Sequence, residues 1–541
     1  MLHLLLPSPP RACYDLQTAS GPVRLSFHLP VPLLSLPFPR RFDRGDVSFI
    51  IVSGAMVAFM VPGLAFLYSG LSRRKSALSL IWAVAASNAV VIFHWYFWGY
   101  SLAFSPSATN GYIGNLRSFG LMKVGADPSP GSPLIPEILY SFFQMEFACV
   151  TAGILMGGLA ERGRVLPAMV FAFCWMTIVY CPLACWAWNI NGWAFKWGVL
   201  DFAGGGPVEI GSGVAGLAYS WVLGRRDERE LLNFRPHNVS LVGLGTFILW
   251  FGWLGFNGGS AFGANLRAIF AIWNTMLAAA FGGMVWCLLD FRIERRWTMV
   301  GFCSGTIAGL VAATPSSGYV KPWSSVVVGV LAGALCNFAT KAKFLLRIDD
   351  ALDLFAEHAV GGMVGLILNA FFASESIIAM DNVTVGVRGG WVDHHWKQLY
   401  IQFTYVVATC AYTFVMTALV AKTIDLIPGL QLRSTPEGEM LGMDEVEIGE
   451  FATDYIELRR DVADCSTFGF SRPANGFRPG DAENERHAQD TVPNGHGPHS
   501  TDNDHDRQAN GHARHDSPAA QVNEQLEVTN EKPENGAPTP P

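Results

Sequence analysis

Long apolar runs separated by short polar segments dominate residues 46–427. Each run is near the ~20 residues that a helix needs to cross roughly 30 Å of hydrocarbon. We therefore predict an all-α integral membrane protein with about eleven spanning helices. The spans are expected at 47–71, 78–104, 138–159, 165–188, a fifth ending at 223, 241–259, 268–289, 300–314, 325–340, 358–372 and 400–421.

Basic residues gather in the loops that follow odd-numbered spans, and such loops are typically cytoplasmic. This pattern predicts an outside N-terminus, a cytoplasmic C-terminus and a multi-pass membrane protein. Five arginines before residue 45 conflict with it, which favours reading 1–45 as an irregular extension or a mispredicted gene start. The basic residues after the odd spans are Arg73, Arg74, Lys75, Arg162, Arg164, Arg225, Arg226, Arg229, Arg292, Arg295, Arg296, Lys341, Lys343 and Arg347.

Composition supports the same division of the chain. Half of the residues are hydrophobic and only 15% are charged, against about 25% charged residues in a soluble domain. We expect a membrane domain over 46–427 and a patterned cytoplasmic segment over 428–461. Residues 462–541 are rich in Asn, Gly, Pro, Asp and His and read as a low-complexity tail.

Several function classes lack support in the sequence. The net charge of −7 includes no concentrated basic stripe, so nucleic-acid binding is not expected. Most of the ten cysteines lie in apolar runs as small hydrophobes, so neither a metal site nor a cofactor is predicted. The chain shows no nucleophile–base pair and no phosphate loop, and we predict that it is not an enzyme.

Candidate chemistry rests on ionisable and aromatic residues within or beside the spans. Buried ionisable groups are costly in a membrane and tend to mark function. Aromatic rings can hold a small cation over their faces, or form an interfacial belt, and both readings stay open. The ionisable groups are Glu146, Asp201, Glu209, Asp349, Asp350, Asp353 and His358; the rings are Phe143, Phe147, Trp188, Trp253 and Phe256.

Four motifs resemble the ammonium transporter family (Amt/Mep/Rh), and within it the fungal Mep branch. They are FFQMEFACVTAGILMGGLAER at 142–162, DFAGGGPVEIGSGVAGL at 201–217, WFGWLGFNGGSAFGAN at 250–265 and DDALDLFAEHAVGGMVG at 349–365. The resemblance implies two inverted, pseudo-symmetric five-helix halves plus one extra helix, a pore in each subunit and a homotrimer.

The resemblance also implies roles for single residues. Substrate recruitment falls to Trp188, Phe143 and Ser260, and the pore gate to Phe147 and Phe256. Asp201 and Asp350 match structural acidic positions. His358 matches the second pore histidine, whereas Glu209 replaces the first. In the cytoplasmic segment Gly442, Asp444, Gly449 and Glu450 match the family's regulatory region, while Ile448 and Thr453 depart from it.

The expected function is uptake of ammonium and methylammonium. Outer-site recruitment would be followed by deprotonation and by electrogenic passage of ammonia plus a proton along Glu209 and His358. The alternatives are an ammonium sensor that signals through its C-terminal tail and an electroneutral, Rh-like gas pore. In the predicted topology the sequon Asn382-Val383-Thr384 faces outside, and Asn238-Val239-Ser240 faces the cytoplasm.

Overall fold

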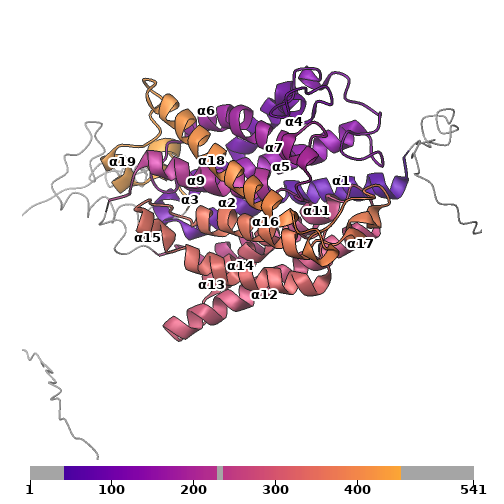
Figure 1. Cartoon of the computed structure of the whole chain (residues 1–541). Helices are drawn as coiled ribbons and strands as arrows, with labels where there is room; N and C mark the ends of the chain where they lie inside the picture. Colours follow the sequence, from indigo (N-terminus) through magenta and orange to yellow (C-terminus); the bar gives the residue numbers. More distant parts are fainter. Residues whose placement is uncertain (1–41, 228–234, 453–541) are drawn as a thin grey trace, which may run out of the picture. The chain divides into compact units, whose positions relative to one another are not determined.

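The computed structural model describes residues 42–227 and 235–452 of the 541-residue chain (Figure 1). The predictions for most of the N-terminal extension, for the last part of the 428–461 segment and for the 462–541 tail lie outside these residues. The domain boundaries themselves stay predictions.

Helices account for nearly all regular structure in the described residues, with two isolated β-bridges besides them. The helices are α1 (Arg44–Ala58), α2 (Met60–Leu71), η3 (Arg74–Ser76), α3 (Ala77–His94), η4 (Trp95–Gly99), α4 (Tyr100–Phe104), η5 (Phe119–Leu121), α5 (Glu137–Leu155), η6 (Met156–Leu159), α6 (Val165–Trp175), η7 (Met176–Tyr180), α7 (Cys181–Trp188), α8 (Trp193–Trp197), η8 (Gly205–Ile210), α9 (Gly211–Leu223), α11 (Val239–Gly259), α12 (Leu266–Glu294), α13 (Met299–Ala313), α14 (Pro322–Ala339), α15 (Ala342–Leu346), η9 (Phe355–Ala359), α16 (Val360–Phe372), α17 (Glu375–Ile378), η10 (Ala379–Asp381), η11 (Trp391–Asp393), α18 (Gln398–Asp425), α19 (Pro436–Leu441) and η12 (Asp444–Ile448).

The predicted all-helical membrane fold is confirmed. Nine helical stretches in the described residues are long and apolar enough to cross a membrane. The remaining two predicted spans are the shorter α13 and the continuous η8–α9 stretch. Several helices extend past the apolar runs, as α18 does on both sides of 400–421, because a helix continues through the polar boundary where hydropathy already falls.

The long helices lie side by side, with α15 and α19 at one end of the bundle and α17 at the other (Figure 1). The first end also carries the loops with Arg73, Arg162 and Arg226, which are joined by contacts to Glu161 and Asp349. We call it the basic end. Small residues let the helices approach closely within the bundle: a Cβ on Gly309 of α13 would collide with the Ala278 carbonyl oxygen of α12.

The fifth helix of each half of the bundle, η8–α9 in the first half and η9–α16 in the second, begins next to a buried aspartate. Asp201 stands eight residues before Glu209, and Asp350 stands eight residues before His358. Each aspartate accepts backbone N–H groups at the start of a π-helical turn, η8 or η9, which continues into a spanning helix. Such N–H groups have no partner within the helix and must find one elsewhere.

The two aspartates accept different numbers of backbone N–H groups. Asp201 Oδ1 accepts from the N–H groups of Gly204 and Gly205 at 3.0 and 2.6 Å, and Oδ2 accepts from Gly206 at 2.8 Å. Asp350 Oδ2 accepts from the N–H of Phe355 at 2.8 Å, while its buried Oδ1 has no partner among the described residues.

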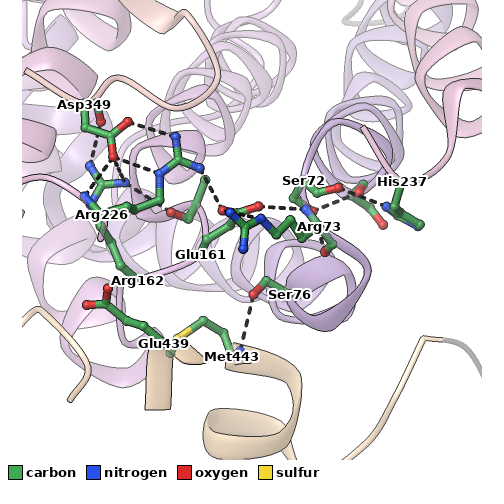
Figure 2. Close-up of polar contacts among 12 residues, drawn as sticks. Ser72, Arg73, Ser76, Glu161, Arg162, Arg226, His237, Asp349, Glu439 and Met443 are labelled. Atoms are coloured by element: carbon green, nitrogen blue, oxygen red, sulfur yellow. Dashed lines mark hydrogen bonds and ion pairs between the residues drawn. The ribbon is translucent and has the colours of Figure 1, made fainter. Parts of the chain in front are cut away.

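The two fifth helices run in opposite directions, as inverted halves require. Arg226 follows α9, and Asp349 precedes η9. The Arg226 Nε atom lies 2.8 Å from Asp349 Oδ2, so the end of one helix adjoins the start of the other. Arg226 also reaches Glu161 Oε2 at 2.7 Å, and Figure 2 shows its guanidinium between the two carboxylates.

Arg162 completes this cluster, which we call the inner charge cluster (Glu161, Arg162, Arg226 and Asp349). Arg162 is fully buried and donates to the backbone oxygen of Asp349 at 2.7 Å. Burial raises the pKa of Asp349, but hydrogen bonds from Arg226 and the charges of Arg162 and Arg226 outweigh burial and hold that pKa well below its usual range. Asp349 is therefore ionised at neutral pH.

We predict that Arg226→Met destabilises the protein by about 3–5 kcal/mol, because it leaves buried carboxylates without their partner. The measurement is thermal unfolding of the purified protein in detergent. Arg225→Met is the matched control, since Arg225 is the exposed neighbour in the same loop. Equal melting temperatures for the two variants would contradict the prediction.

The low pKa of Asp349 also makes the stability of the fold depend on pH. A carboxyl whose folded-state pKa is depressed stabilises the fold above its unfolded pKa of about 3.9 and loses this effect as pH falls through the folded pKa. The melting-temperature advantage of the native chain over Asp349→Asn should stay constant from about pH 7 to pH 5 and shrink only below about pH 4. An advantage that vanishes by pH 6 would exclude this account. Glu445→Gln, at an exposed carboxylate, is the control.

We expect Asp201 and Asp350 to contribute unequally to the stability of the fold. Asp201→Asn should cost roughly 2–4 kcal/mol, because an amide has one acceptor oxygen and its NH2 group cannot accept the remaining N–H. Asp350→Asn should cost about 1 kcal/mol or less, because one amide oxygen suffices for the Phe355 N–H. Both are measured by thermal unfolding in detergent, and the reverse order would refute the asymmetry.

Candidate functional site

The candidate site includes two phenylalanines on α5. Phe143 and Phe147 are one helical turn apart and therefore share a face, with ring centroids 4.9 Å apart. Both are almost completely buried. Phe147 stacks on Phe256 of α11, with centroids 3.9 Å apart and planes 24° apart. The structure thus brings the two predicted gate residues into direct contact.

Trp188, at the end of α7, lies on the other side of Phe147. Its ring meets the Phe147 ring edge-on at 6.1 Å. Its Nε1 donates to the backbone oxygen of Asp201 at 3.3 Å, which orients the indole. The ring is half-buried, so one part of the aromatic group stays open to the surroundings.

Ser260 follows α11, one turn beyond Phe256. Its hydroxyl donates to the Phe256 backbone oxygen at 2.9 Å and stays available as an acceptor. The Phe143 ring packs against the neighbouring Gly259, where a Cβ would lie 2.7 Å from it. The three predicted recruitment residues therefore lie around the stacked pair, although only Phe143 and Trp188 contact Phe147 as rings.

The Glu209–His358 pair forms between the two fifth helices. His358 Nδ1 lies 2.9 Å from Glu209 Oε2. Glu209 is fully buried, and His358 is 4% exposed. The second carboxyl oxygen, Oε1, is buried with no hydrogen-bond partner among the described residues. A hydrogen-bonded acid and base with one unused acceptor can exchange a proton and bind a small N–H donor.

The run Gly204–Gly206 connects the rings to this pair. Gly204 has φ 113°, in the left-handed region that favours glycine. A Cβ on Gly206 would collide with the Tyr405 hydroxyl. The Asp201 carboxylate occupies the centre of this turn and is committed to backbone N–H groups, so it acts on the site by holding η8 in place.

Three residues with no assigned role also belong to the site. Trp253 packs against Phe256 at 5.8 Å and donates through Nε1 to Thr314 Oγ1 at 2.8 Å. The Thr314 backbone oxygen accepts from the N–H of Ala203, in the Asp201 turn. Tyr405 of the extra helix α18 donates to Asp201 Oδ2 at 3.3 Å. The sequence singled out Trp253 as one ring of the aromatic group, but Thr314 and Tyr405 join only through long-range contacts.

The segment that follows α18 packs against the basic end. Asp444 Oδ1 and Oδ2 accept from the N–H groups of Ser79 and Leu78, at the start of α3. Burial raises the Asp444 pKa, and these N–H bonds oppose that rise. Gly442, at φ 114°, lies against Lys75, where no Cβ would fit. Of the predicted regulatory residues, Gly442 and Asp444 are buried in this contact, whereas Gly449 and Glu450 are exposed.

Glu447 and Arg433 strengthen the same contact. Glu447 accepts from the N–H of Val165 at 3.0 Å and pairs with Arg164 at 3.2 Å, at the start of α6. Arg433 donates to the backbone oxygens of Leu223 and Arg225 after α9. The segment therefore links the loops that follow spans one, three and five.

Comparisons with known proteins agree with this geometry. A model of the Ammonium Transporter Family matches residues 48–453. Ammonium transporter MEP3 of Saccharomyces cerevisiae is 56% identical over 421 residues, which cover 78% of this chain and 86% of that protein. The crystal structure of Saccharomyces cerevisiae Mep2 has a TM-score of 0.71 and 47% identity, over 74% of this chain and 93% of that chain.

A more distant solved structure, described as Sensor Amt Protein, has a TM-score of 0.67 and 29% identity, over 75% of this chain and 98% of that chain. The family match covers most of the chain, and MEP3 is named as an ammonium transporter. The chain therefore belongs to the ammonium transporter family.

Proposed function

We propose that this protein takes up ammonium and methylammonium across the plasma membrane. The observation that carries the proposal is the buried Glu209–His358 pair, which lies in the two inverted fifth helices of an ammonium-transporter fold. A hydrogen-bonded acid and base at such a site suits a substrate that gains and loses a proton.

Recruitment selects the charged form, ammonium. Trp188 and Phe143 offer ring faces to a cation, and the Ser260 hydroxyl offers an acceptor. The Trp188 N–H is occupied by the Asp201 backbone oxygen, so the indole contributes its π face. Neutral ammonia gains little from ring faces, and this difference favours the cation.

The stacked rings of the gate then hinder passage of the charged form. Phe147 and Phe256 lie 3.9 Å apart and leave no gap between their rings, so passage requires a ring to move. Carrying a bare charge through such apolar surroundings costs several kcal/mol or more. Deprotonation near the gate removes that cost and lets ammonia pass.

The Glu209–His358 pair relays the proton in this mechanism. Glu209 Oε1 is the open acceptor for an N–H of the substrate, and Oε2 is bonded to His358 Nδ1. Ammonia and a proton cross together, which makes transport electrogenic. Asp201 and Asp350 keep η8 and η9 in place, and neither contacts the substrate.

The N-terminus lies outside and the C-terminus lies in the cytoplasm in this proposal, because the basic end carries the cytoplasmic segment and the basic loops. The protein acts as a homotrimer in the lipid bilayer. Large apolar side chains exposed along α11 and α12, such as Phe251 and Trp273, support burial in lipid or against other subunits.

A second candidate function is ammonium sensing through the C-terminal segment. The contacts of residues 433–447 with the loops after spans one, three and five favour it, since a change in these loops would reach the segment directly. The likeness to a structure described as Sensor Amt Protein supports the same idea. A chain ending at Asp461 that still transports but no longer signals would point to both functions.

We predict that Glu209→Gln lowers the ammonium-induced current by about 100-fold, because the amide keeps the hydrogen bond to His358 but cannot carry a proton. The measurement is the current across a solid-supported membrane carrying purified protein after an ammonium jump. Glu375→Gln, at an exposed carboxylate, is the control.

A native current equal to that of Glu209→Gln would refute the relay. Ammonia flux without current in the native chain, detected by a pH dye inside vesicles, would identify an electroneutral gas pore instead. His358→Ala should also abolish the saturable current.

A further inference from the structure

We infer that Asn382 carries an N-linked glycan. The inference rests on the proposed orientation, with the basic end in the cytoplasm. The sequence contains two sequons, Asn238-Val239-Ser240 and Asn382-Val383-Thr384, and they differ in position, exposure and side-chain contacts.

The loop that holds Asn382 lies at the end of the bundle opposite to the basic end. Helix α16 continues from η9, whose start adjoins Asp349 and Arg226, and ends at Phe372. Helix α18 begins at Gln398 and ends at Asp425, whose carboxylate accepts from the N–H of Leu432 in the cytoplasmic segment. Residues 373–397, which include α17, therefore connect the far ends of both helices (Figure 1).

The side chain of Asn382 is available for modification. It is exposed and makes no hydrogen bond to another described residue. Its backbone has φ 58°, a left-handed conformation that asparagine tolerates, and its N–H donates to the Ala379 oxygen at 3.0 Å. A glycan on the amide would break no contact of the folded loop.

Thr384 and Asp381 hold the sequon in a defined turn. The Thr384 hydroxyl donates to Asp381 Oδ2 at 2.6 Å, and Asp381 Oδ1 accepts from the N–H groups of Val383 and Thr384. Asp381 in turn forms a buried ion pair with Arg267 of α12 at 2.6 Å. This anchor keeps Asn382 at the surface.

A surface hollow of about 540 Å³ adjoins Asn382. Its walls include Asn265 and Ser376, which can hydrogen-bond sugar hydroxyls, and Ile269 and Met380, which can contact the apolar face of a sugar ring. The hollow gives the first sugar both space and partners.

The chemical step is transfer of an oligosaccharide from a polyprenyl pyrophosphate donor. The Asn382 Nδ2 atom forms a bond to the anomeric carbon, the bond from that carbon to the pyrophosphate oxygen breaks, and Nδ2 loses one proton. No oxidant or reductant takes part.

Asn238 provides the matched control. It lies at the basic end, where its N–H donates to the Gly70 oxygen and its Oδ1 accepts from the N–H of Leu241 at the start of α11. Its side chain serves as a helix cap, and the proposed orientation places it on the cytoplasmic side. It should stay unmodified.

The experiment expresses the full chain in a yeast and follows its gel mobility before and after endoglycosidase treatment. The native chain, Asn238→Gln and Thr384→Ser should each shift by one step, since Thr384→Ser keeps the sequon. Asn382→Gln and Thr384→Ala should migrate like the treated native chain and should not shift. A native chain whose mobility the enzyme does not change overturns the inference.

A second measurement separates this inference from the orientation on which it rests. Val385 and Leu345 are 69% and 85% exposed and lie at opposite ends of the bundle. A cysteine is introduced at each position in turn. An impermeant maleimide added to intact cells should label Val385→Cys and not Leu345→Cys, beyond the background of the native chain. Labelling at Val385 with no glycan refutes the glycan alone, whereas labelling at Leu345 refutes the orientation.

Discussion

The carboxylate of Asp201 accepts three backbone N–H groups at the start of η8, and the rest of the site depends on this contact. A helix that begins inside an apolar bundle leaves N–H groups that water cannot reach, and each unsatisfied group costs several kcal/mol in hydrocarbon. The buried aspartate removes this cost and lets η8 start at Gly205. Glu209 then projects from that turn toward His358.

In the other half of the fold, Asp350 likewise accepts a backbone N–H at the start of η9 and so positions His358. One aspartate caps its helix near the stacked rings, and the other caps its helix near the inner charge cluster. The acid and the base therefore come from two helices that run in opposite directions. Their side chains meet where the two helices cross, and neither helix alone could form the pair.

The basic end joins this core to the segment that follows α18. The Arg162 guanidinium donates to the backbone oxygen of Asp349, beside the start of η9, and the Arg162 backbone oxygen accepts from the N–H of Ser434. A chain of short contacts thus leads from the segment to the helix that carries His358.

Hydrophobic length and residue motifs are local properties, so the sequence was sufficient to predict about eleven spans, their order and the resemblance to the family. It also identified Glu209, His358 and the aromatic group as candidates. It left open whether the rings form a site or an interfacial belt, and it gave no role to Thr314 or Tyr405. The tertiary structure added the contacts: the stacking of Phe147 on Phe256 and the hydrogen bond from Tyr405 to Asp201 join residues far apart in the chain. Such contacts depend on how the helices cross, which no local pattern encodes.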